Sequence, residues 1–173
     1  QAGMLVSTLA EPEPGLYVVQ MRFALAGRLD RLRLTRAWEE LTARHEMLRT
    51  AVVWNNTPTP VNVIMTDAAV PVEWLDLSQH DSISRSEAIQ NFLAEDRRRG
   101  FDLHQAPLSR VTVVVLSEDE WEMVWTHQHL GLDGGATAQL MAELWRSDNG
   151  QAAHGSEARY RACVSRVGTG AAR

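Results

Sequence analysis

Large apolar residues recur at every second position within residues 17–27, and residues 31–49 then follow a different period. In the first segment every second side chain is apolar, which predicts a half-buried strand. From residue 31 the apolar positions recur every three or four residues, which predicts an amphipathic helix with Asp30 as N-cap and an end near Arg49. The alternating strand positions are Val19, Met21, Phe23 and Leu25.

The next part of the chain contains short extended pieces followed by a second helix. Residues 51–54, 61–65 and 72–75 predict strands separated by turns that contain proline. Ser84 and Glu87 have the spacing of a capping box, and Gly100 marks the end of this helix. The arginine run 97–99 fits a solvated helix end that complements the helix dipole better than it fits an anion site.

Two long apolar runs, 110–116 and 121–129, flank the acidic turn "SEDE" and predict an antiparallel hairpin of mostly buried strands. Leucine, methionine and tryptophan at helical spacing after Gly134 predict a third helix. The order of elements therefore predicts a mixed α/β fold whose strand pairs are not all parallel.

Composition limits the function further. The 173 residues are 45% hydrophobic, which suits one compact domain. The 17 basic residues are all arginine and stand against 22 acidic ones, so we expect no nucleic acid or membrane partner and no lysine chemistry. The single cysteine, Cys163, excludes an internal disulfide and is expected to be a buried thiol. With no signal peptide or apolar run of membrane length, we predict a reduced, cytoplasmic protein.

Candidate chemistry concentrates in "VWTHQHLGLDGG", residues 124–135. On a strand, His127 and His129 share one face, and His129 comes at the strand end. Asp133 and Gly134 then open a helix, whose free N–H groups and positive dipole end suit a developing oxyanion beside His129.

Two other interpretations of this corner remain open on the residues alone. Two histidines two apart with a following aspartate can ligate zinc, but the metallohydrolase pattern needs an aspartate and a histidine where this chain has Gly131 and Leu132. We therefore expect no metal. Alternatively, the histidines are packed strand residues and Asp133 is an ordinary N-cap.

The whole chain, up to about residue 160, resembles the condensation domains of nonribosomal peptide synthetases. "QAGML" is similar to the end of that family's opening motif, and "RHEMLRT" to its RHExLRT motif. "RRRGFDLHQAPLSRV" is similar to the segment before the family's hairpin, and "HQHLGLDGG" to its HHxxxDG motif. Four blocks in the family's order are more specific than any one of them.

The resemblance implies an α/β fold like that of chloramphenicol acetyltransferase, with a mixed sheet sandwich and flanking helices. In that fold two lobes form a V, and the tunnel between them reaches the active-site histidine. We expect residues 1–160 to be the N-terminal lobe and residues 161–173 to begin the connection to a second lobe or an irregular tail.

Matching the HHxxxDG motif position by position makes His129 the active-site histidine and Gly134 the motif glycine, and we expect both in the catalytic site. The family's first histidine is replaced by Gln128, at a position regarded as structural. Gly135 stands where the family often has tryptophan. The resemblance also implies that Asp133 is a structural anchor, paired with Arg44 or Arg49 of the RHEMLRT segment.

The implied activity is peptide-bond formation between a carrier-bound acyl or peptidyl thioester and an aminoacyl thioester. The substrates ride on the 4'-phosphopantetheine arms of upstream and downstream peptidyl carrier proteins, and we expect no cofactor bound by this chain itself. The second lobe and adjacent synthetase domains are the other expected partners, and the fragment alone is expected to be inactive. Gln128 and Gly135 motivate an alternative, a weak or inactive docking or recruitment module, and related epimerisation or ester-forming domains share the same residues.

Overall fold

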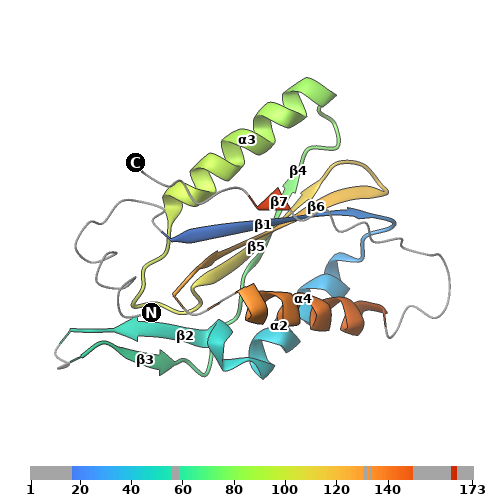
Figure 1. Cartoon of the computed structure of the whole chain (residues 1–173). Helices are drawn as coiled ribbons and strands as arrows, with labels where there is room; N and C mark the ends of the chain where they lie inside the picture. The colour runs from blue at the N-terminus through green and yellow to red at the C-terminus, as the bar shows by residue number, and fades with distance from the viewer. Residues whose placement is uncertain (1–16, 56–58, 131, 133, 150–164, 167–173) are drawn as a thin grey trace.

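In the computed structural model, helices and strands alternate irregularly along the chain (Figure 1). The structure describes residues 17–55, 59–130, 132, 134–149 and 165–166. The elements in chain order are β1 (Val18–Ala26), α2 (Arg31–Arg44), the 3₁₀ helix η1 (Glu46–Arg49), β2 (Thr50–Val53), β3 (Val61–Ile64), β4 (Val72–Asp76), α3 (Ser82–Arg99), β5 (Ser109–Val115), β6 (Glu120–Gln128), α4 (Gly134–Asn149) and β7 (Ser165–Arg166).

Five strands form a mixed sheet in the order β4-β5-β6-β1-β7. The β4 and β5 strands are parallel, and every other pair in this sheet is antiparallel. The β5–β6 hairpin and its long neighbour β1 form the centre, and β2 with β3 forms a separate two-stranded ribbon. This arrangement confirms the predicted mixed α/β fold and the predicted hairpin.

Helices cover both faces of the sheet, with α3 on one side and α2 together with α4 on the other (Figure 1). The larger core cluster contains Trp38 of α2, Trp125 of β6 and Leu140 of α4. The smaller cluster lies under α3 and contains Leu93 and Val124. Since Val124 and Trp125 are neighbours, the two faces of β6 belong to two different cores, as strand alternation requires.

The first helix ends earlier than its apolar period predicts. Helix α2 stops at Arg44 because His45 is extended, with φ −111° and ψ 104°, and a 3₁₀ turn then runs to Arg49. The Arg49 guanidinium donates to the carbonyl oxygens of Thr42 and Ala43, which the helix end leaves without intrahelical partners. The 3₁₀ turn still buries Leu48 to 1% exposure, so the apolar period continues after the α-helix has ended.

The predicted capping box of α3 is wrong, although the helix and its end at Gly100 are confirmed. The N-cap is Asp81, whose Oδ1 accepts hydrogen bonds from the backbone N–H groups of Ile83 and Ser84 at 2.9 and 3.0 Å. These bonds, first among them the one from Ser84, lower the pKa of the Asp81 carboxyl. Because the Asp81 carboxylate accepts these two helix N–H groups, Ser84 is not the cap and its hydroxyl instead donates to Asp81.

Among the described residues, no helix is long and apolar enough to cross a membrane.

The Asp30 N-cap of α2 is confirmed, because its side chain accepts a hydrogen bond from the backbone N–H of Arg33 at 3.0 Å.

The corrected cap gives a direct test. We expect Asp81→Ala to lower the urea midpoint of unfolding, because two N–H groups at the start of α3 lose their acceptor. Glu87→Ala is the matched control at an exposed position of the same helix and is expected to leave the midpoint nearly unchanged. A larger loss in Glu87→Ala than in Asp81→Ala would restore the capping box.

Candidate functional site

His129 follows directly after the last residue of β6 and is half-buried. Its backbone N–H bonds to the carbonyl oxygen of Tyr17 at 2.9 Å, just before β1. Its ring Nδ1 lies 2.9 Å from the carbonyl oxygen of Leu132. A carbonyl oxygen only accepts, so this contact places the ring proton on Nδ1 and leaves the lone pair of Nε2 available as a base.

The contact with Leu132 also brings the start of α4 close to His129. Helix α4 begins at Gly134, two residues after Leu132, and Gly134 is exposed. The Gly134 carbonyl accepts a hydrogen bond from the Thr137 hydroxyl at 3.0 Å, within the first turn. The expected N-cap, Asp133, lies outside the described residues. Helix α4 thus begins two residues after the carbonyl group that contacts His129, and oxyanion stabilisation by its first N–H groups stays a prediction.

Tyr17 holds its carbonyl against His129 from an unusual backbone conformation. Its φ is 59°, in the left-handed region that residues with a side chain seldom adopt. Strain of this kind is kept only where surrounding contacts impose it, and it is common at functional sites. The bond from the His129 N–H is one such contact.

His127 is a core residue, as its alternation with Trp125 predicts. It is 1% exposed, and its ring centroid lies 4.8 Å from that of Trp125. Its Nδ1 is 3.4 Å from the Gln128 carbonyl oxygen, and Nε2 is buried with no hydrogen-bond partner among the residues described. Burial lowers the pKa of His127 from 6.5 to about 4, so this ring is neutral near pH 7.

Gln128 is buried at 4% exposure, and its backbone N–H bonds to the Leu108 carbonyl oxygen at 3.0 Å. It lines a small pocket of about 30 Å³ together with side chains from the β2–β3 ribbon, β5 and the loop after β6. The residues that line this pocket with Gln128 are Met47, Leu48, Thr50, Val52, Asn62, Leu108, Ser109, Leu130 and Leu132. A position enclosed in this way is consistent with the structural role that the resemblance gives to residue 128.

The two arginines of RHEMLRT have different partners. Arg44, 54% exposed at its side chain, forms an ion pair with Glu143 of α4. His45 Nε2 lies 2.7 Å from the other oxygen of Glu143, and this contact is the main cause of the lowered Glu143 pKa. Arg49 donates to carbonyl oxygens of residues 42 and 43 and to that of Met65, at 2.9 Å. The expected partner Asp133 lies outside the described residues, so its pairing stays a prediction.

Sequence reasoning missed Glu143 and the buried Asp96 of α3, which is 5% exposed. Nothing in a single sequence links Glu143 to a motif about a hundred positions earlier. For Asp96 a signal exists, because Ile89, Leu93 and Asp96 form the buried stripe of α3 at spacings of four and three. A carboxylate on that stripe predicts a buried partner.

No group of three or more histidine, cysteine, aspartate or glutamate side chains is placed to hold a metal ion within the described part of the chain. Cys163 lies outside that part.

The low pKa of His127 predicts a pH dependence of stability. The unfolded chain takes up a proton on His127 below pH 6.5, whereas the folded chain resists it down to about pH 4. The neutral His127 ring therefore contributes to stability above pH 6.5, and this contribution is lost as the pH falls. The free energy of unfolding is expected to drop by about 2 kcal/mol between pH 7 and pH 5. Urea unfolding at both pH values measures it.

His127→Met removes the titrating ring and is expected to flatten this dependence, while the exposed His80→Gln is expected to retain it. Equal slopes in wild type and His127→Met would contradict the assignment.

Comparison with known proteins identifies the family to which this site belongs. The family model for the condensation domain matches residues 1–154. A linear gramicidin synthase of Brevibacillus parabrevis is 34% identical over 158 residues, which cover 91% of this chain and 3% of that protein. Bacitracin synthase 3 of Bacillus licheniformis is 31% identical over 145 residues, covering 84% of this chain and 2% of that protein.

Solved structures show the same fold. The first condensation domain of the calcium-dependent antibiotic synthetase, in complex with a substrate analogue, matches with a TM-score of 0.75 at 19% identity, covering 90% of this chain and 38% of that chain. The tallysomycin biosynthesis protein TlmII matches with a TM-score of 0.70 at 23% identity, covering 83% and 33%. The chain thus spans a small part of its curated relatives and less than half of these solved chains. With the family model covering most of its length, this chain belongs to the condensation-domain family.

Proposed function

We propose that this chain is the N-terminal lobe of a domain that forms peptide bonds in nonribosomal peptide synthesis. The observation that carries the proposal is the placement of His129 at the end of β6. Its Nδ1 bonds to the Leu132 carbonyl oxygen, so its Nε2 can accept a hydrogen bond or a proton. The family membership and the synthetases among the relatives support the same activity.

In the proposed reaction the amine of an aminoacyl thioester attacks the carbonyl carbon of an acyl or peptidyl thioester. A C–N bond forms, the C–S bond breaks, and the donor arm leaves as a thiolate, which becomes the free thiol on taking up the proton that the amine loses. An α-ammonium has a pKa of about 8 and is partly neutral near pH 7, so the site mainly needs to align the two substrates. His129 Nε2 orients the amine and receives its proton, and the N–H groups at the start of α4, including Gly134, stabilise the oxyanion.

The proposed partners follow from the substrates. Upstream and downstream peptidyl carrier proteins deliver the two thioesters on 4'-phosphopantetheine arms, which supply the reactive thioester group. Residues 1–160 form the N-terminal lobe in this proposal, and residues 161–173 begin the connection to a second lobe that completes the tunnel. Adjacent synthetase domains and a cytoplasmic location belong to the same proposal.

The first test is an amide-forming assay with two loaded carrier proteins and this chain joined to its native continuation. We expect His129→Ala to lower kcat at least about 100-fold, because the amine loses its acceptor. Gln128→His, which restores the family's first histidine, is the matched control at the neighbouring position and is expected to stay within a few-fold of wild type.

Unchanged turnover in His129→Ala would remove the catalytic assignment. If wild type and variant both fold and bind a carrier but make no amide, the recruitment module suggested by Gln128 and Gly135 becomes the function.

We also propose that Asp133 pairs with Arg49 rather than Arg44. Arg44 already has the Glu143 carboxylate, whereas the acceptors that surround Arg49 in the described structure are neutral carbonyl groups. A double-mutant cycle of Asp133→Asn with Arg49→Gln is expected to give a coupling of about 1 kcal/mol or more in the free energy of unfolding. The cycle with Arg44→Gln is the control, and a larger coupling there would reverse the assignment.

A further inference from the structure

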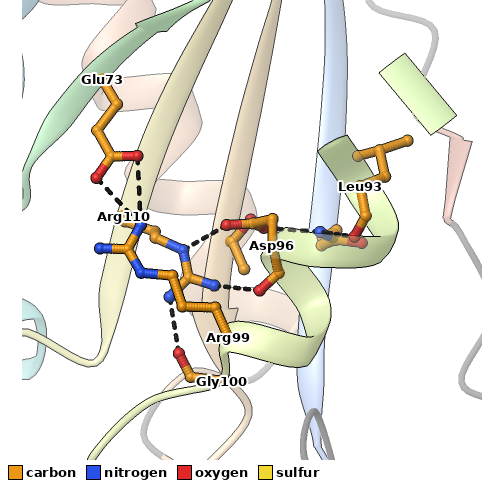
Figure 2. Close-up of polar contacts among 8 residues, drawn as sticks. Glu73, Leu93, Asp96, Arg99, Gly100 and Arg110 are labelled. Carbon is orange, nitrogen blue, oxygen red and sulfur yellow. Dashed lines mark hydrogen bonds and ion pairs between the residues drawn. The ribbon is translucent and has the colours of Figure 1, made fainter. Parts of the chain in front are cut away.

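One buried carboxylate connects helix α3 to three strands of the sheet (Figure 2). Asp96 Oδ2 accepts hydrogen bonds from the Thr126 hydroxyl at 2.6 Å and from Gln20 Nε2 at 2.7 Å. Asp96 Oδ1 accepts from Arg110 Nε, and the Asp96 carbonyl oxygen accepts from Arg110 Nη2. Both carboxylate oxygens are therefore occupied, by donors from β1, β5 and β6.

The three donors form one row across the sheet. Gln20 is the register partner of Thr126 on one side of β6, and Arg110 is its partner on the other. All four residues are at most 5% exposed. Arg110 also donates to the Gly100 carbonyl oxygen at 2.8 Å, and its guanidinium lies 4.4 Å from the centre of the Phe101 ring. Each guanidinium nitrogen of Arg110 and each carboxylate oxygen of Asp96 thus has a hydrogen-bond partner, which favours a buried ion pair.

Stability alone does not explain such a cluster, because apolar side chains of similar volume commonly stabilise a core as well as a buried ion pair does. A cluster of directional hydrogen bonds also specifies the strand register, because its bonds form at only one alignment of the strands. The alignment fixed here is that of β1 with β6. Those two strands continue outward to Tyr17 and His129, whose carbonyl oxygen and N–H are bonded at 2.9 Å.

Thr126 lies three residues before His129, a distance of about 10 Å along an extended strand. Between them, on the same face as Thr126, only Gln128 intervenes, and its backbone is bonded to Leu108. The Thr126–Asp96 hydrogen bond thus joins α3 to β6 three residues before His129.

We propose that Asp96 is a positioning residue for His129, which it places by fixing the alignment of β1 and β6 through Thr126 and Gln20. The catalytic consequence rests on the function proposed above. The structural consequence is protection of the bond between the His129 N–H and the Tyr17 carbonyl oxygen, and it does not rest on that function.

The test uses this chain joined to its native continuation. Thr126→Val removes the hydroxyl contact on Asp96 but keeps the side-chain shape, the Arg110 pair and the Gln20 contact. Thr112→Val is the matched control, because Thr112 is a buried threonine of β5 at 4% exposure that does not donate to Asp96. Thr126→Ser is the conservative variant that retains the hydroxyl.

Two measurements are made on all three variants: hydrogen exchange of the peptide that carries the His129 amide, and kcat and KM for amide formation. We expect Thr126→Val to speed exchange and to lower kcat, each about tenfold, with KM nearly unchanged. We expect Thr126→Ser to recover both values. Thr112→Val is expected to match wild type in both, after any difference in melting temperature is taken into account.

Equal exchange and equal kcat in Thr126→Val and Thr112→Val would overturn the proposal and leave Asp96 as a purely structural residue. If wild type makes no amide, the proposed function fails, and the exchange rate at His129 alone decides the positioning proposal. Asp96→Asn is the stronger variant, and because it can fail to fold, Thr126→Val carries the test.

Discussion

The burial of β6 on both faces is the constraint on which the rest of the structure depends. Every residue of this strand after Glu120 is buried, with α3 over one face and α2 with α4 over the other. Each polar group on β6 must therefore find a partner inside the protein or stay uncharged. Trp125 Nε1 donates to the Ser109 hydroxyl at 2.6 Å, and Thr126 donates to Asp96. His127 meets the same constraint by remaining neutral.

The same constraint separates two histidines that look alike in the sequence. His127 lies in the middle of the core at 1% exposure, where burial lowers its pKa to about 4 and keeps the ring neutral near pH 7. His129 comes after the last strand residue and is half-buried, with one ring nitrogen held by a carbonyl and the other available. The two histidines are only two positions apart, but the strand leaves the core between them. His127 is therefore a packing residue, whereas His129 is a candidate base.

Much of this arrangement could be predicted from the sequence, because it depends on local periodicity. Alternation predicted β1, and two long apolar runs around an acidic turn predicted the β5–β6 hairpin. Three- and four-residue spacing predicted α2 and α4, and the signals at the two helix ends predicted α3. The end of α2 at Arg44 and the Asp81 cap were missed, because both depend on which carbonyl or N–H a nearby side chain reaches. The pairs Arg110–Asp96 and Arg44–Glu143 join elements far apart in the chain. A single sequence carries no record of such contacts beyond a polar residue on an apolar stripe.

The hydrogen bonds that fix β6 also bear on Gln128, the residue that departs from the family's motif. Its side chain is enclosed, its backbone is bonded to Leu108, and the row below it is fixed by the Asp96 cluster. The Leu108 and Asp96 bonds do not depend on which side chain stands at position 128, because one is made by its backbone and the other by Thr126. The glutamine in place of the first histidine lines the small pocket beside the strand, so a change at this position changes that lining while these two bonds remain available.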